Sequence, residues 1–202
     1  MKVGRELSTQ PAGADRLTAS RSPYWGVPVA RAIPALIVGL VLTFVPNHSS
    51  QIGLFAFGAF SLVSGVLIAG LSFRTMPKST SRSLFVLQGV VMAIAGVLAL
   101  ALNSFPLAFL FYLVSVSSAI AAMLELYSGI RAKGSNPAAK DWIVVGAATG
   151  VLALIFLLLP LTAVVAVGLL GAYGIMLGIF LLIAGLSLRW GTTTNPTKLV
   201  EN

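Results

Sequence analysis

Six long apolar runs, separated by short polar breaks, occupy most of the chain. They cover residues 27–45, 52–73, 84–102, 107–130, 142–159 and 163–188. Each run holds 18 to 26 residues, and a helix needs roughly 20 residues to cross a hydrocarbon core of about 30 Å. Strands of a membrane barrel are shorter and alternate in polarity. The pattern therefore predicts an all-α, polytopic membrane protein with six transmembrane helices.

The composition agrees with this pattern. Hydrophobic residues make up 57% of the chain and charged residues 9%, with a mean hydropathy of +0.98, whereas charged residues are about a quarter of a soluble domain. We expect a six-helix membrane domain over 25–190, preceded by a flexible polar tail at 1–24 and followed by a second tail at 191–202. The first apolar run starts too late and is too long for a signal peptide. No segment is left for a soluble catalytic domain.

The basic residues predict the orientation. All 13 Lys and Arg residues lie in the two tails, in the first turns of the first run, directly after the last run, or around the connections 74–82 and 131–140. The other three connections contain none. By the positive-inside rule, both termini are cytoplasmic. Trp25, Trp142 and Trp190 fall at the same helix ends, where we expect their rings at the headgroup level. Topology and anionic lipid explain the net charge of +8 without nucleic acid.

A repeated phrase indicates internal duplication. The pentapeptide GVLAL occurs at 96–100 and 150–154, and each time a proline follows ten residues after the glycine. The prolines Pro46, Pro106 and Pro160, at the three outer turns, are 60 and 54 residues apart, and the glycines Gly39, Gly96 and Gly150 are 57 and 54 residues apart. Two helices per copy predict three parallel hairpin units at about 25–78, 82–133 and 140–190.

Small residues support the repeat in the second helix of each unit. Gly58 and Gly65 of unit one align with Gly171 and Gly178 of unit three, and placing unit two by its proline assigns Glu125 to the second of these positions. Such small-residue faces let helices approach closely in lipid, so we predict internal helix packing, with a seam between copies as the alternative. The predicted packing glycines are Gly39, Gly58, Gly65, Gly96, Gly146, Gly150, Gly171, Gly174 and Gly178.

These features resemble a known family. The phrases GLVLTFVP, GVLALALNSFP and GVLALIFLLLP, with the small-residue second helices, look like the HdeD family of bacterial acid-resistance membrane proteins, from about residue 25 to residue 190. The resemblance implies a location in a bacterial plasma (inner) membrane and a role in acid or envelope stress. It carries over no catalytic residue.

Two charged residues lie inside the apolar runs, Arg31 and Glu125. Counted from the outer turns, they lie about 22 Å and 27 Å inward, near the cytoplasmic interface. There they either snorkel to the headgroups or form a structural ion pair, and a proton or ion pathway is the alternative. The single histidine, His48, lies in an outer turn and is a candidate for a pH response.

The sequence lacks the motifs of common enzymes and metal sites. We expect a protein that is not an enzyme and has no cofactor, with the lipid bilayer, a second copy or other membrane proteins as partners. It would act in stress resistance through packing and partners. The alternative is a small transporter or channel for protons or solutes, for which the candidate lining residues are Gln88, Thr149, Ser115, Ser117 and Ser118.

Overall fold

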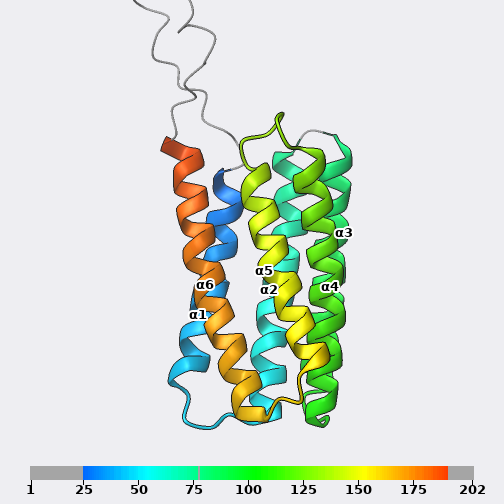
Figure 1. The fold of residues 1–202 in the computed structure, drawn as a ribbon, viewed down its shortest axis with the longest axis vertical. Helices are drawn as coiled ribbons and strands as arrows, with labels where there is room; N and C mark the ends of the chain where they lie inside the picture. Colours follow the sequence, from blue (N-terminus) through cyan, green and yellow to red (C-terminus); the bar gives the residue numbers. More distant parts are fainter. Residues whose placement is uncertain (1–24, 77, 191–202) are drawn as a thin grey trace, which may run out of the picture.

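The fold was analysed in a computed structural model that describes residues 25–76 and 78–190. Six helices follow one another (Figure 1). They are α1 (Gly26–Phe44), α2 (Ser50–Thr75), α3 (Thr80–Ala101), α4 (Leu107–Arg131), α5 (Ala139–Leu158) and α6 (Ala163–Trp190). Each is long and apolar enough to cross a membrane, and the described residues contain no strand. The predicted fold class is confirmed, whereas the predicted tails at 1–24 and 191–202 lie outside the described residues.

Polar caps set several helix ends outside the apolar runs. Ser79 precedes α3, and its hydroxyl oxygen accepts a hydrogen bond from the Arg82 amide at 3.3 Å, which satisfies one of the free amides of the first turn. The helix therefore begins four residues before its apolar run at residue 84. Ser49 caps α2 in the same way, and Pro106 is the residue immediately before α4. Hydropathy alone marks the apolar part of a helix and not its capped start.

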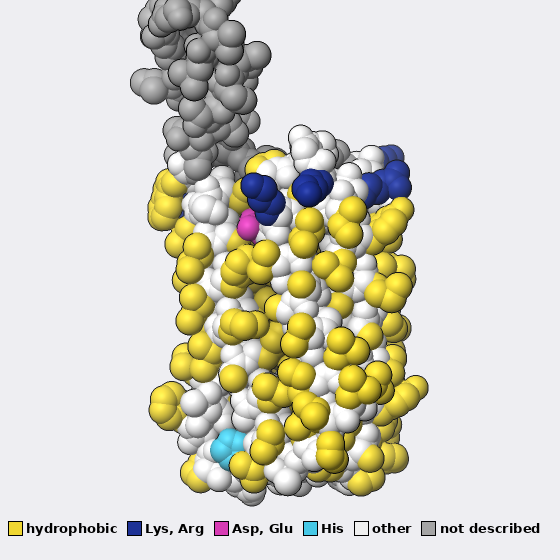
Figure 2. Space-filling view, in the orientation of Figure 1, with side chains coloured by type: hydrophobic (Ala, Val, Ile, Leu, Met, Phe, Trp, Pro, Cys, Tyr) yellow, Lys and Arg dark blue, Asp and Glu magenta, His cyan; other side chains and the backbone are white. Residues whose placement is uncertain are grey.

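The bundle has two chemically different ends. We call the end where α1 begins and the connections α2–α3 and α4–α5 lie the basic end, and the opposite end the turn end (Figure 1). Figure 2 shows Lys and Arg side chains gathered at the basic end, with hydrophobic side chains over the visible face between the two ends. Pro46, Pro106 and Pro160 lie in the three connections at the turn end. This arrangement is that of a multi-pass membrane protein.

The closest helix pairs are not the predicted hairpins. Helices α2 and α3, α4 and α5, and α1 and α6 pack most closely, whereas α5 and α6 contact each other little although they are consecutive. The pairing of α1 with α6 closes the six helices into a ring. The three hairpin units are therefore connected in the sequence, but the close packing joins the second helix of one unit to the first helix of the next.

Glycines explain these three close seams. An added Cβ atom at Gly96 of α3 would lie 2.8 Å from the carbonyl oxygen of Gly58 in α2. The corresponding contacts are 3.1 Å from Gly146 in α5 to the Ala122 carbonyl oxygen in α4, and 2.9 Å from Gly39 in α1 to the Gly171 carbonyl oxygen in α6. In each seam the backbones touch, which only glycine permits at such separations. Gly39, Gly96 and Gly146 are therefore structurally equivalent, as are Gly171, Gly58 and Ala122.

This register corrects the repeat alignment of unit two by one helical turn. Gly65 and Gly178 correspond to Gly129, whose added Cβ atom would lie 2.9 Å from the Ala139 carbonyl oxygen. Glu125 does not replace a seam glycine, contrary to the prediction. Gly150 is not one of the close-contact glycines of the seams, because a Cβ atom there would be 3.5 Å from the Ala122 side chain, an ordinary contact. Alignment by the prolines places unit two in the wrong register, because the three units differ in the length of the loop around the proline.

The tryptophan prediction holds only in part. Trp190 is 67% exposed at the basic end, as expected for a ring at the headgroup level. Trp142 is only 4% exposed, and its ring packs edge-on against Phe85 of α3 with 4.8 Å between ring centroids. It belongs to an apolar cluster inside the basic end of the bundle. Trp142 therefore lies at the predicted end of the bundle, but its ring packs inside the bundle and is not on the surface.

Candidate functional site

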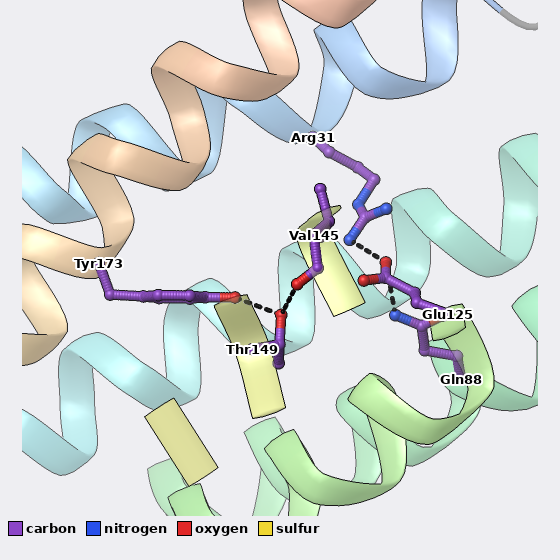
Figure 3. A network of polar contacts seen from close by, with 6 residues as sticks. All are labelled: Arg31, Gln88, Glu125, Val145, Thr149 and Tyr173. Carbon is purple, nitrogen blue, oxygen red and sulfur yellow. Dashed lines mark hydrogen bonds and ion pairs between the residues drawn. The ribbon is translucent and has the colours of Figure 1, made fainter. Parts of the chain in front are cut away.

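A cavity of about 50 Å³ lies among the helices, and every one of the six contributes to its wall. Most of the wall is apolar, and the polar side chains that line it are Arg31, Ser64, Gln88, Ser118, Glu125, Thr149 and Tyr173. Five of these side chains belong to two hydrogen-bonded groups (Figure 3), one formed by Arg31, Gln88 and Glu125 and the other by Thr149 and Tyr173. The cavity and this polar lining are the candidate functional site.

The first group is centred on Glu125 of α4. Arg31 Nη2 lies 2.7 Å from Glu125 Oε1, and the two side chains are 9% and 1% exposed. Gln88 Nε2 of α3 donates to the same carboxylate oxygen at 3.0 Å. One carboxylate thus connects α1, α3 and α4 (Figure 3). Of the two structural roles left open by the sequence, the geometry is that of an ion pair, because both side chains are buried inside the bundle.

The two donors to Glu125 occupy equivalent places in the repeat. Arg31 and Gln88 are 57 residues apart, the same separation as the seam glycines Gly39 and Gly96. Each lies eight residues before the glycine of its own helix. Two positions that are equivalent in the repeat therefore place their side chains against the same carboxylate, that of Glu125. An uncompensated charge in this environment is costly, and the paired charges sum to zero.

The second group joins α5 to α6. The Tyr173 hydroxyl lies 2.6 Å from Thr149 Oγ1, and Thr149 Oγ1 lies 2.8 Å from the Val145 carbonyl oxygen, to which it donates. Since a threonine hydroxyl has one hydrogen, Tyr173 must be the donor to Thr149. This bond therefore bridges the two consecutive helices that otherwise contact each other least (Figure 3).

The remaining polar candidates divide into two groups. Ser118 lines the cavity with Gln88 and Thr149. Ser115 and Ser117 instead donate to carbonyl oxygens of their own helix, those of Tyr112 and Leu113, at 3.1 Å and 2.6 Å. Such bonds satisfy a serine hydroxyl without a partner helix. The three serines could not be told apart by their positions, because all lie within residues 115–118.

Two residues of the site were not among the predicted ones. Tyr173 lies between Gly171 and Gly174 of α6, and Ser64 lies next to Gly65 of α2, which are predicted packing glycines. A phenol among small residues in an apolar run was a usable signal, because a buried tyrosine hydroxyl usually has a hydrogen-bond partner. A serine carries no such signal, since it fits equally well into a packed seam.

His48 lies apart from this site. Its ring nitrogen Nε2 is 3.1 Å from the Leu42 carbonyl oxygen in the last turn of α1, and the residue is half-buried at the turn end. Leu42 is eleven residues after Arg31 along α1, which is about 16 Å along a helix axis. The histidine therefore stabilises the end of α1 and is not brought together with the ion pair.

Apolar side chains enclose the polar groups from both ends. At the turn end the core includes Leu42, Leu54, Leu110, Val114 and Val167, each 1% exposed or less. At the basic end it includes Val27, Ile68, Phe85 and Trp142. The described residues hold no cluster of three His, Cys, Asp or Glu side chains that would fit a metal ion. The site offers buried charge and hydrogen bonding within an otherwise apolar bundle.

One part of the chain matches a known family. Residues 87–159 match a family described as a short repeat of unknown function, DUF308. The match extends from α3 into the end of α5, and it includes Gln88, Glu125 and Thr149 but not Arg31 or Tyr173. No curated protein and no solved structure matches the chain. The comparison thus supports a membrane protein with short helical repeats.

Proposed function

We propose that this chain is an HdeD-like protein of a bacterial inner membrane that contributes to acid or envelope stress resistance without catalysis. Both termini and the basic end face the cytoplasm in this proposal, because the positive charges gather there. The match of residues 87–159 to the short-repeat family supports the assignment, since that family contains HdeD-like membrane proteins. The protein would act through helix packing, the surrounding lipid and membrane partners.

The observation that carries this proposal is the enclosure of the polar site between two apolar clusters. Leu54 and Leu110 have no measurable exposure at the turn end, and Phe85 is 1% exposed at the basic end. A path across the whole bundle would have to pass the turn-end cluster, which resists water and ions because each polar group that enters an apolar layer must give up its hydration. The three glycine seams hold the same helices together. This arrangement favours a stable, closed bundle over an open conduit.

The test is acid survival of a deletion strain, with internal pH followed in the same cells. The strain is complemented with the wild type, with Arg31→Gln combined with Glu125→Gln, and with His48→Gln as a control outside the site. Rescue by all three, in proportion to the amount of folded protein in the membrane, is expected for a packing role. Absence of any survival defect in the deletion strain under acid and envelope stress would refute the proposal.

Transport of a small solute is the second candidate, and a specific observation favours it. The cavity is lined by a buried charge pair and by hydroxyl and amide groups from several helices, as in sites where transporters hold polar solutes. The neighbouring α5 and α6 have few contacts, so these helices have the most freedom to separate.

Flux into proteoliposomes separates the two candidates. Purified protein is reconstituted with a pH-sensitive dye inside the vesicles, and an acid step is applied outside. A closed bundle gives the same proton entry as protein-free vesicles, and the neutralised double variant behaves like the wild type. Faster entry with the wild type that is abolished by Glu125→Gln, with the variant still folded, would support transport instead.

A further inference from the structure

The central cavity contains buried polar atoms that the protein itself does not satisfy. Gln88 donates to Glu125 through Nε2, but its carbonyl oxygen Oε1 has no hydrogen-bond partner among the described residues. The Ser64 hydroxyl also lacks one. Both residues line the cavity, at 2% and 3% exposure. A buried group without a partner costs about 1–3 kcal/mol, so two such groups at one cavity indicate that something else binds there.

The dimensions of the cavity select the ligand. The cavity has a volume of about 50 Å³, and one water molecule needs room for a single probe sphere of roughly 10–15 Å³. The cavity therefore has room for a few water molecules. Water can donate to Gln88 Oε1 and both donate to and accept from Ser64 Oγ, which matches the two unsatisfied groups.

A second, smaller crevice lies beside the cavity at the basic end. It has a volume of about 10 Å³ and is formed by α1, α5 and α6, with the half-buried Asp141 among its walls. Arg31 and Leu181 line both spaces. The arginine of the ion pair is therefore part of the walls of both spaces.

We propose that the central cavity is a hydration site for the Arg31–Glu125 pair, and that water reaches it from the basic end, between α1, α5 and α6 and past Arg31. The turn end is closed by side chains of 1% exposure or less, including Leu42 and Leu110. Access is therefore one-sided. The buried acid exchanges water with the side of the membrane that faces the basic end and not with the other side. This inference does not depend on a role in stress resistance.

The chain has no cysteine, so a single introduced thiol reports access directly. Ser64→Cys places the thiol in the cavity. Ser61→Cys is the matched control, because Ser61 lies on the same helix, is 0% exposed and also lacks a partner for its hydroxyl, but does not line the cavity. The probe is Ag⁺ in chloride-free buffer, a cation of about the size of water. The charged residues lining the two spaces are Arg31, Glu125 and Asp141, which sum to one negative charge and do not repel it.

Thiols that remain free after Ag⁺ treatment are counted by maleimide labelling of the denatured protein. The Ser64→Cys thiol should react roughly tenfold faster than the Ser61→Cys thiol or more, because the control needs a local opening of the bundle first. Ser118→Cys, on the α4 wall of the same cavity, is a second reporter and should react like Ser64→Cys. Equal slow rates at both cavity positions and at Ser61→Cys would overturn the hydration site.

The route is tested by filling the crevice in the Ser64→Cys background. Ala184→Leu adds bulk to the crevice wall, and Gly168→Leu adds bulk on the same helix at a position where nothing lies within 4 Å. The first change should slow the Ag⁺ reaction severalfold and the second should not. Partial unfolding cannot imitate this result, since it would raise the reactivity of a buried thiol. An unchanged rate with Ala184→Leu would overturn the proposed entry between α1, α5 and α6.

Discussion

Replacing Gly96 with alanine should destabilise the bundle, whereas the same change at Gly150 should stabilise it, although both glycines begin the phrase GVLAL. The structure separates them. A Cβ atom at Gly96 would lie 2.8 Å from both the Gly58 carbonyl oxygen and the Leu62 Cα atom, which are backbone atoms that cannot rotate away. At Gly150 the nearest atom is the Ala122 Cβ, at 3.5 Å.

The magnitude follows from these distances. Ordinary contact begins at 3.4 Å, and the atom nearest to the added methyl group is the Leu62 amide nitrogen, which lies closer than the two atoms at 2.8 Å. Helices α2 and α3 must therefore separate by more than 0.6 Å (3.4 minus 2.8) to accept the methyl group. Overpacking of this kind costs typically about 1–3 kcal/mol. Alanine is favoured over glycine within a helix by roughly 0.5–1 kcal/mol, and this gain applies to both variants. It therefore cancels in the comparison, and Gly96→Ala should be less stable than Gly150→Ala by about 1–3 kcal/mol.

The assay is reversible unfolding in mixed detergent micelles, followed by helical circular dichroism. Free energies of unfolding are compared for the wild type and the two variants. Gly39→Ala is a further member of the first class, because its Cβ atom would lie 2.6 Å from the Ile175 amide nitrogen in the α1–α6 seam. Equal destabilisation by Gly96→Ala and Gly150→Ala would refute the reasoning, since it would mean that the repeated phrase, and not the seam, determines the cost.

Three further predictions follow from the site and the charges. Glu125→Gln should lower the free energy of unfolding by several kcal/mol, because it leaves the buried Arg31 without its counter-charge. Reversal of both charges should restore part of the loss. Failure of cysteines at 31 and 125 to cross-link with a reagent of ion-pair length would contradict the pair. Tyr173→Phe should lower the free energy of unfolding by about 0.5–1.5 kcal/mol in the same assay, because it removes one hydrogen bond between α5 and α6. Adding Thr149→Val to Tyr173→Phe should cost only the hydrogen bond from Thr149 to the Val145 carbonyl oxygen, because the bond between Tyr173 and Thr149 is already lost. Reporter fusions at positions 48, 104 and 161 should lie outside the cell and fusions at 78, 136 and 198 inside it, and an external signal at 136 would overturn the six-helix topology.

The candidate site was only partly readable from the sequence. Arg31 and Glu125 stood out because a charge in an apolar run is rare, and the helical rise placed both nearer the basic end. Their common depth made an ion pair reasonable. Whether they face one another depends on the rotation of α1 and α4 about their axes, and therefore on which helices are neighbours. Gln88 and Thr149 were visible as polar residues, but Tyr173 and Ser64 join the site only through the tertiary arrangement.

What the sequence by itself determined are the properties that come from one helix at a time: the number and approximate bounds of the spans, the all-α class and the separation of charge between the two ends. These follow from hydropathy and local geometry, because the bilayer requires each span to satisfy its own backbone. What only the tertiary structure decided is the pairing. Gly129 and Gly146, not Glu125 and Gly150, occupy the equivalent seam positions, and α6 closes the ring on α1. In lipid the hydrophobic effect does not choose between apolar faces, so close backbone packing and buried polar contacts select the neighbours, and these depend on several helices at once.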